Sequence, residues 1–155
     1  MIPHPKGNSE MNEKTNALLE KAIAIAVRAH AGHVDRYGQP YILHPLHLMM
    51  QMDSPAARMV AVLHDVVEDT EVTLADLQAA GFPAEVLEAV SLLTHDRERV
   101  SYEAYVAGIK PHPLARKVKL ADLQHNMDIR RLPHLEPKDL ERLQKYHRAW
   151  LTLTE

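Results

Sequence analysis

Hydrophobic residues recur along most of this chain at the three- and four-residue spacing that places them on one side of an α-helix. The first such segment runs from Asn12 to Ala31, and Gly32 is a residue suited to end it. The last segment begins at Pro137 and continues to the C-terminus. No segment shows the alternation that is typical of a half-buried strand. The pattern therefore predicts an all-α protein.

Between these two segments, helix starts are marked by residues that cap or open helices. Serine and threonine accept hydrogen bonds from the first free backbone amides of a helix, and proline fits its first turn. Such signals occur at Pro45, Ser54-Pro55, Thr73 with Asp76, Pro83, Ser101 and Pro113. The last of them is expected to open a long helix that reaches Arg131. Together they predict a single-domain bundle of seven or eight helices.

Residues 1–11 differ from the rest of the chain because proline, glycine, asparagine and serine are frequent there. We expect a flexible N-terminal lead over 1–11 and one folded domain over 12–155. A chain of 155 residues buries about two thirds of its unfolded surface, which is enough for a core without additional cross-links.

The densest group of ionisable side chains lies in an apolar stretch around residue 65. If this stretch is one helix, four side chains share a sector of about 140° on it: His64, Asp65, Glu68 and Asp69. Valine and leucine occupy the remainder, so the helix is expected to be buried. Three inward-facing carboxylates repel one another and lose hydration unless a cation or a protonated partner lies between them, and a metal ion is the simplest solution. The cluster therefore predicts a metal ion.

Composition restricts the ligands and the partners. The chain has no cysteine, so a metal must be held by histidine and carboxylate side chains. A formal net charge of -3 argues against a general affinity for nucleic acids. No apolar run approaches the roughly 20 residues that cross a bilayer, and the N-terminus lacks the apolar part of a secretory signal. We therefore expect a cytoplasmic protein without nucleic-acid or membrane partners.

A divalent ion needs more donors than the His64-Asp65 pair supplies. His44 lies at a predicted loop-to-helix junction, and Asp122 lies among apolar neighbours in the segment that opens at Pro113. Three further polar residues share a side of that predicted helix with Asp122, within about 80°: Lys119, Asn126 and Arg130. This mixture of carboxylate, amide and cations suits a phosphorylated substrate.

Three blocks of the sequence resemble the hydrolase half of the RelA/SpoT proteins, which are HD-domain metal phosphohydrolases. The blocks are residues 38–45 (GQPYILHP), 63–70 (LHDVVEDT) and 118–122 (VKLAD), followed by Asn126. A His-Asp pair alone is a weak signal, but three blocks in the same order are specific. The resemblance covers roughly residues 17–150. Because the chain has no synthetase domain, it is most similar to the free-standing small alarmone hydrolases.

The resemblance implies an HD-type fold and a 3′-pyrophosphohydrolase that acts on ppGpp and pppGpp, the alarmones of the stringent response. It implies a divalent ion, most often manganese, held by four residues: His44, His64, Asp65 and Asp122. It also implies that Glu68 and Asp69 orient or deprotonate the attacking water, which fits their position one turn beyond the ligands.

The resemblance further implies contacts to a nucleotide. Asn126 matches a position that contacts it, and the other residues expected to bind phosphate or ribose are Lys119, Arg142 and Tyr146, with Arg97 a weaker candidate. Long members of the family carry Arg-Lys where this chain has Asp35-Arg36. Arg36 can replace the second cation, but Asp35 cannot stack on guanine, and Tyr37 could do so instead. An adenine alarmone such as ppApp therefore stands beside the guanine alarmones as a substrate.

Two other functions fit the same residues. Another HD phosphohydrolase, such as a 5′-nucleotidase, would release orthophosphate instead of pyrophosphate. A catalytically silent alarmone-binding module is the other alternative, although it has little use for Glu68 and Asp69. The histidines outside the three blocks, including His30, His47 and His125, are expected to be surface or packing residues.

Overall fold

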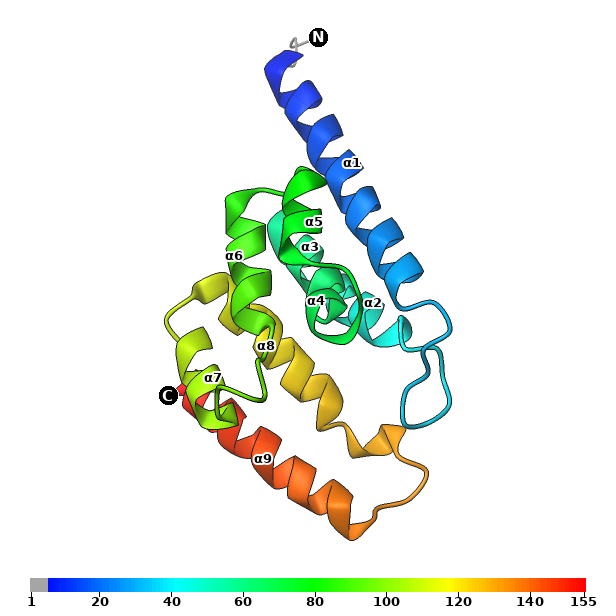
Figure 1. Ribbon diagram of the computed structural model, residues 1–155, viewed down its shortest axis with the longest axis vertical. Helices are drawn as coiled ribbons and strands as arrows, with labels where there is room; N and C mark the ends of the chain where they lie inside the picture. The colour runs from blue at the N-terminus through cyan, green and yellow to red at the C-terminus, as the bar shows by residue number, and fades with distance from the viewer. Residues whose placement is uncertain (1–5) are drawn as a thin grey trace, which may run out of the picture.

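The computed structural model describes residues 6–155 as a set of helices joined by short loops (Figure 1). The helices are α1 (Lys6–Ala29), α2 (Leu43–Met50), α3 (Pro55–Leu63), α4 (Val66–Asp69), α5 (Leu74–Ala79), α6 (Ala84–Leu93), α7 (Tyr102–Ile109), α8 (Pro113–Asn126) and α9 (Pro137–Thr154), with a 3-10 turn at Ile129–Arg131. Helix α4 is a single turn. Over residues 6–155 the extended pairing is limited to an isolated bridge between Val34 and Pro40. The predicted all-α bundle is therefore confirmed.

Helices begin where the capping residues predicted them. Ser54 and Ser101 each accept a hydrogen bond from the backbone amide three residues on, at the starts of α3 and α7. Thr73 and Asp76 form a reciprocal capping box at the start of α5. Each cap satisfies backbone donors that have no partner within the helix.

Helix α3 is the central element of the core. Residues 59–63 are at most 2% exposed, and the helix packs against α1, α2, α6 and α8. A helix that is hydrophobic on all sides is stable only when other elements cover it. The C-terminal end of α3, which His64 follows directly, is therefore held from several directions.

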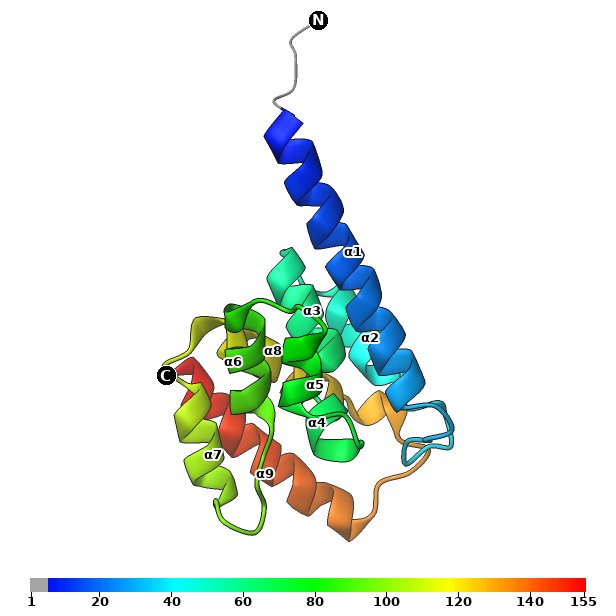
Figure 2. The same cartoon turned by 45° about the horizontal axis from the view of Figure 1, so that its top comes forward.

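The loop between α1 and α2 and the N-terminal end of α9 lie on the same side of the bundle (Figures 1 and 2). Arg36 in the loop donates to Asp139 in the first turn of α9, over 2.6 Å between Nη2 and Oδ1. Helix α9 also packs against α7 and α8. This ion pair therefore joins the loop that follows α1 to the start of α9.

Two helix boundaries differ from the prediction. Helix α1 begins at Lys6, so residues 6–11 of the expected lead are helical, and residues 1–5 lie outside the described residues. Helix α8 ends at Asn126 and does not reach Arg131. The cause is Asp128, whose side chain accepts from the backbone amide of Arg130 and so favours a new turn over a longer helix. None of the helices within residues 6–155 combines the length and apolar character that a membrane span needs.

Candidate metal and substrate site

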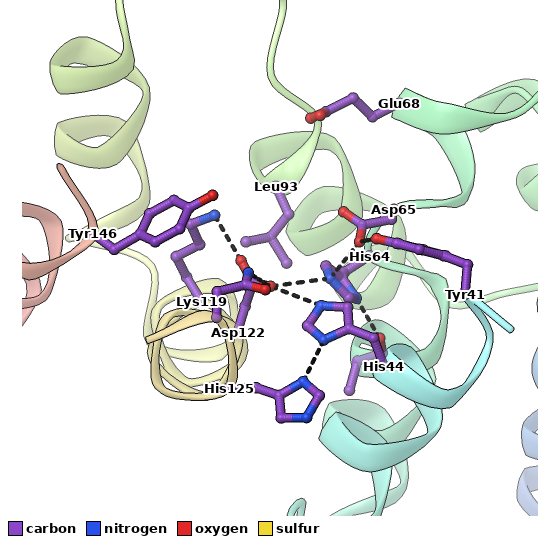
Figure 3. Close-up of polar contacts among 12 residues, drawn as sticks. Tyr41, His44, His64, Asp65, Glu68, Leu93, Lys119, Asp122, His125 and Tyr146 are labelled. Carbon is purple, nitrogen blue, oxygen red and sulfur yellow. Dashed lines mark hydrogen bonds and ion pairs between the residues drawn. The ribbon is translucent and has the colours of Figure 1, made fainter. Parts of the chain in front are cut away.

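Three segments that are far apart in the sequence bring the predicted metal ligands together (Figure 3). His44 stands in the first turn of α2, the His64-Asp65 pair follows α3, and Asp122 lies near the C-terminal end of α8. Helix α3 packs against both α2 and α8. The central helix therefore sets the distances between the three segments.

The helix that carries the acidic cluster is interrupted at the ligands, so the prediction of one continuous helix was wrong. Asp65 has a φ of -104° and a ψ of -2°, and a separate turn, α4, begins after it. Nδ1 of His64 lies 2.6 Å from the backbone carbonyl of Ala61, to which it donates. Because that nitrogen carries the proton, Nε2 of neutral His64 keeps a lone pair for a ligand.

Nε2 of His64 is a buried nitrogen without a hydrogen-bond partner among residues 6–155. It lies 2.9 Å from Oδ2 of Asp65 and 3.6 Å from Oδ1 of Asp122. Burial alone would lower the pKa of His64, but the two carboxylates outweigh it and raise the pKa well above its ordinary value. The surroundings of Nε2 therefore favour a positive charge, which a proton or a divalent cation can supply.

The donor atoms of His44, His64 and Asp65 lie within 4.8 Å of one another. Nε2 of His44 is also 2.9 Å from Oδ1 of Asp122. Asp122 is not in this group of three, but its Oδ1 also lies 3.6 Å from Nε2 of His64. The four predicted ligands are therefore neighbours, and two imidazoles with two carboxylates form a donor set suited to manganese, iron or zinc. The residues present fit a divalent metal ion.

Asp122 forms hydrogen bonds with more side chains than the other predicted ligands do. Its carboxylate accepts from Lys119 at 2.8 Å and from the side-chain amide of Asn126 at 2.9 Å. Burial alone would raise the pKa of Asp122, but Lys119 and the neighbouring histidines hold the pKa well below its ordinary value. Lys119 and Asn126, predicted as substrate contacts, therefore also orient this carboxylate.

The structure adds residues to the site for which no role was predicted from the sequence. The hydroxyl of Tyr41 donates to Oδ2 of Asp65, and the ring of the buried His30 lies 4.9 Å from the ring of Tyr41. His125 lies against His44. The burial of His30 against Tyr41 agrees with the prediction of a packing residue, whereas His125 also contacts the predicted ligand His44, which was not predicted. Their sequence neighbourhood, next to the site loop and to Asn126, was the only available signal.

Glu68 and Asp69 lie beyond the ligands, on the single turn α4. Glu68 accepts from the backbone amide of His95 at 2.7 Å and from Arg97 at 3.1 Å. Partial burial, together with Asp65 and Glu68, raises the pKa of Asp69 to about 6. Neither carboxylate belongs to the group of donors around His64, and both line the adjoining cavity.

That cavity has a volume of about 730 Å³ and extends from the ligands to α9. It is lined by all of the residues predicted to bind substrate: Arg36, Tyr37, Lys119, Asn126, Arg142 and Tyr146. It is also lined by residues that the sequence did not single out, among them Tyr102, Tyr105, Arg131 and Lys145. A cavity with several cations and aromatic rings suits a ligand with phosphates and a base.

Two polar residues near this cavity differ from expectation. Arg130 does not share a face with Asp122, because α8 has ended, and its guanidinium instead pairs with Asp128 at an exposed position. Asp35 accepts hydrogen bonds from the backbone amides of Tyr37 and Gln39, at 2.8 and 2.9 Å. Its carboxylate therefore stabilises the turn of its own loop. The ring of Tyr37 instead lies 5.3 Å from the guanidinium of Arg131.

Comparisons with known proteins were made at the level of sequence and of structure. No protein-family model matches the chain. The chain is similar to a guanosine-3′,5′-bis(diphosphate) 3′-pyrophosphohydrolase of Haemophilus influenzae, with 36% identity over 135 residues, which are 78% of this chain and 20% of that protein. It is also similar to the bifunctional (p)ppGpp synthase/hydrolase SpoT of Escherichia coli, with 34% identity over 139 residues, or 81% of this chain and 19% of that protein.

A GTP pyrophosphokinase of Streptomyces coelicolor is 33% identical over 135 residues, or 79% of this chain and 16% of that protein. The chain thus spans about a fifth or less of the length of these relatives. A solved structure described as a metazoan ortholog of SpoT that hydrolyzes ppGpp superposes with a TM-score of 0.71, covering 99% of this chain and 95% of that one at 19% identity. The chain is thus similar in sequence to one segment of these (p)ppGpp hydrolases and synthases, and it shares the fold of the solved structure.

Proposed function

We propose that this protein is a metal-dependent hydrolase that removes pyrophosphate from the 3′ position of nucleotide alarmones, with manganese as its ion. The observation that carries the proposal is the buried Nε2 of His64, which faces two carboxylates without a hydrogen bond. A structural His-Asp pair would satisfy this nitrogen, since buried polar atoms are nearly always hydrogen-bonded. The names of the relatives support (p)ppGpp as the substrate.

We assign the ion to His44, His64, Asp65 and Asp122. When bound, a divalent cation lowers the pKa of a coordinated water and offsets the charge of the phosphoryl oxygens. Tyr41 and Lys119 each hold one carboxylate of this set in place, by donating to Asp65 and to Asp122. Such support of the ligating side chains is worth about 10- to 100-fold in metal affinity or activity.

Glu68 and Asp69 are assigned to the attacking water. Both lie at the boundary between the ligands and the larger cavity, where a water directed at a bound phosphoryl group would stand. The pKa of Asp69, raised to about 6, suits a group that accepts a proton near neutral pH. These carboxylates favour catalysis over the alternative of a silent binding module.

The cations around the cavity are assigned to the phosphates of the nucleotide. Arg36 and Arg142 reach it from the loop and from α9, and Lys145 lies on α9 beside Tyr102. The pair formed by Tyr37 and Arg131 offers a planar surface for a purine base. Backbone amides of its own loop hold the carboxylate of Asp35 in the turn, and we propose that guanine and adenine alarmones are both accepted.

The products formed from different nucleotides test this function. The manganese-loaded protein is incubated with ppGpp, pppGpp, ppApp and a nucleoside 5′-monophosphate, and the products are separated by anion-exchange chromatography. We expect pyrophosphate and a nucleotide with a free 3′-hydroxyl from the three alarmones. Release of orthophosphate from the monophosphate, without turnover of the alarmones, would instead identify a 5′-nucleotidase. Binding of alarmones without any turnover would identify a silent module.

A further inference from the structure

His125 lies on the last turn of α8 and contacts the side of His44 that faces away from the metal ligands (Figure 3). The two Nδ1 atoms are 2.7 Å apart. The ring planes differ by 9° and the centroids are separated by 4.9 Å. Face-to-face rings with so short an N···N distance would have closer centroids, so the rings are nearly coplanar and joined by an N–H···N hydrogen bond.

This bond decides which nitrogen of His44 can bind a metal. A neutral imidazole has one N–H group and one lone pair. Nε2 of His44 points to Asp122, at 2.9 Å, and can serve as a ligand only when the proton is on Nδ1. That proton then needs an acceptor, and Nδ1 of His125 is the partner within hydrogen-bonding distance.

The other ligating histidine is held in a different way. Nδ1 of His64 donates to the backbone carbonyl of Ala61, which can only accept, so its tautomer is fixed. The partner of His44 is an imidazole, which can accept or donate. The tautomer of His44 therefore depends on His125 and on what holds its ring.

The ring of His125 is held between two elements. His47, one turn after His44 on α2, packs on the ring with a centroid separation of 4.1 Å and an angle of 22°. The guanidinium of Arg131 donates to the backbone carbonyl of His125 at 2.8 Å. A second cavity of about 360 Å³, lined in part by His47 and His125, opens beside the ring.

We infer that His125 is a positioning residue that accepts the Nδ1 proton of His44 and thereby keeps Nε2 of His44 available to the metal ion. The inference rests on the metal site of the proposed function. It assigns no contact between His125 and the ion or the substrate.

Two substitutions separate the hydrogen bond from the packing. His125→Phe keeps a flat ring against His47 but removes the acceptor. His125→Asn removes the ring but places Oδ1 at the same number of bonds from the backbone as Nδ1, so the acceptor is retained. His47→Phe is the matched control, because it keeps a flat ring against His125 and leaves the hydrogen bond between His44 and His125 in place.

Manganese alone is titrated into each folded, metal-stripped protein, and the free ion is measured by its electron paramagnetic resonance signal. We expect His125→Phe to weaken the apparent Kd about 10- to 100-fold, and His125→Asn and His47→Phe to stay within about threefold of the unsubstituted chain. Equal affinity of the Phe variant and the unsubstituted chain, or equal losses in the Phe and Asn variants, would overturn the inference alone. Failure of the unsubstituted chain to bind manganese would overturn the proposed function as well.

Nitrogen-15 NMR of the zinc-loaded protein reads the tautomer directly, without any turnover. We expect the proton of His44 on Nδ1, with a coupling across the hydrogen bond to Nδ1 of His125. A proton on Nε2 of His44, or a bond in which His125 is the donor, would contradict the assignment.

Discussion

Glu68 and Asp69 are neighbours in the chain but stand in different surroundings. Glu68 is fixed by the backbone of His95 and by Arg97, which compensate its charge. Asp69 has no hydrogen bond or ion pair of this kind within residues 6–155, and the pKa of its carboxyl is raised to about 6 by partial burial and by Asp65 and Glu68. One carboxylate is therefore held in a fixed orientation as an anion, and the other changes protonation near neutral pH.

Replacing Glu68 distinguishes a role in activating the attacking water from a role in metal binding. Because Glu68 does not belong to the donor group around His64, we expect Glu68→Gln to retain the metal ion and to lower kcat about 10²- to 10⁴-fold, the usual effect of losing a general acid or base. Metal content is measured by mass spectrometry and kcat by pyrophosphate release. Glu71→Gln, an exposed change three residues on, is the control. Loss of the ion from the Glu68 variant would show that Glu68 is a ligand.

The raised pKa of Asp69 predicts a pH-dependent stability. The folded state holds this proton more tightly than the unfolded state, in which the pKa is near 4, so ionisation of Asp69 lowers stability as the pH rises from about 4 to above 6. The Asp69→Asn variant has no ionisable group at this position, so it does not lose stability in this pH range. In urea denaturation of the metal-stripped protein, the variant should gain stability over the unsubstituted chain at pH 7.5 and much less at pH 4.5. An equal difference at both values would refute the assigned shift.

At the scale of elements, the site depends on where α3 ends. The buried helix ends at Leu63, and the next residues turn so that Nε2 of His64 faces Asp65 and Asp122. The hydrophobic pattern predicted a buried helix here but could not predict this interruption. The interruption depends on the hydrogen bond from His64 to Ala61 and on contacts from Tyr41 and α8, which are formed only in the folded protein.

The cap of α3 offers a test of this element. Ser54 accepts from the backbone amide of Ala57, and its loss would leave that donor without a partner in the helix. We expect Ser54→Ala to lower the free energy of unfolding by about 1 kcal/mol, and Ser54→Asp to restore most of it. Urea denaturation measures both. A neutral Ser54→Ala change would mean that packing alone fixes the start of α3.

At the scale of the whole molecule, the cavity is closed by parts of the chain that are distant in sequence. The loop before α2 is tied to α9 through Arg36 and Asp139, which are 103 residues apart. The guanidinium of Arg36 is partly exposed, so this ion pair contributes little to stability, but it places a cation at the cavity.

Arg36 is therefore expected to matter for the substrate more than for the fold. Arg36→Gln should raise KM for an alarmone about 10- to 100-fold, the cost of losing a charged hydrogen bond, with a small change in Tm. Arg130→Gln is the matched control, since Arg130 stands outside the cavity and pairs with Asp128. Steady-state kinetics and thermal unfolding measure the two effects. Equal KM values in both variants would remove Arg36 from the substrate site.

The sequence predicted the helices, most of their starts and the four candidate ligands, because capping residues and hydrophobic spacing act locally. It could not predict contacts that depend on packing between helices. Asp35 differs from the prediction because its carboxylate accepts hydrogen bonds from backbone amides of its own loop. Arg130 lies outside the predicted site because Asp128 ends the preceding helix. Arg131 and His125 were not predicted at the site because their positions depend on how the end of α8 packs against α2.

Hydrolysis of ppGpp during a metal titration tests whether one bound ion is needed for the release of pyrophosphate. Manganese is added stepwise to the metal-stripped protein, and the release of pyrophosphate is measured at each step. We predict that release is absent without the ion, rises in proportion to the ion added and saturates at one ion per chain. Full turnover by the metal-stripped protein, or no release of pyrophosphate once one ion per chain is bound, would contradict the proposed metal-dependent hydrolysis.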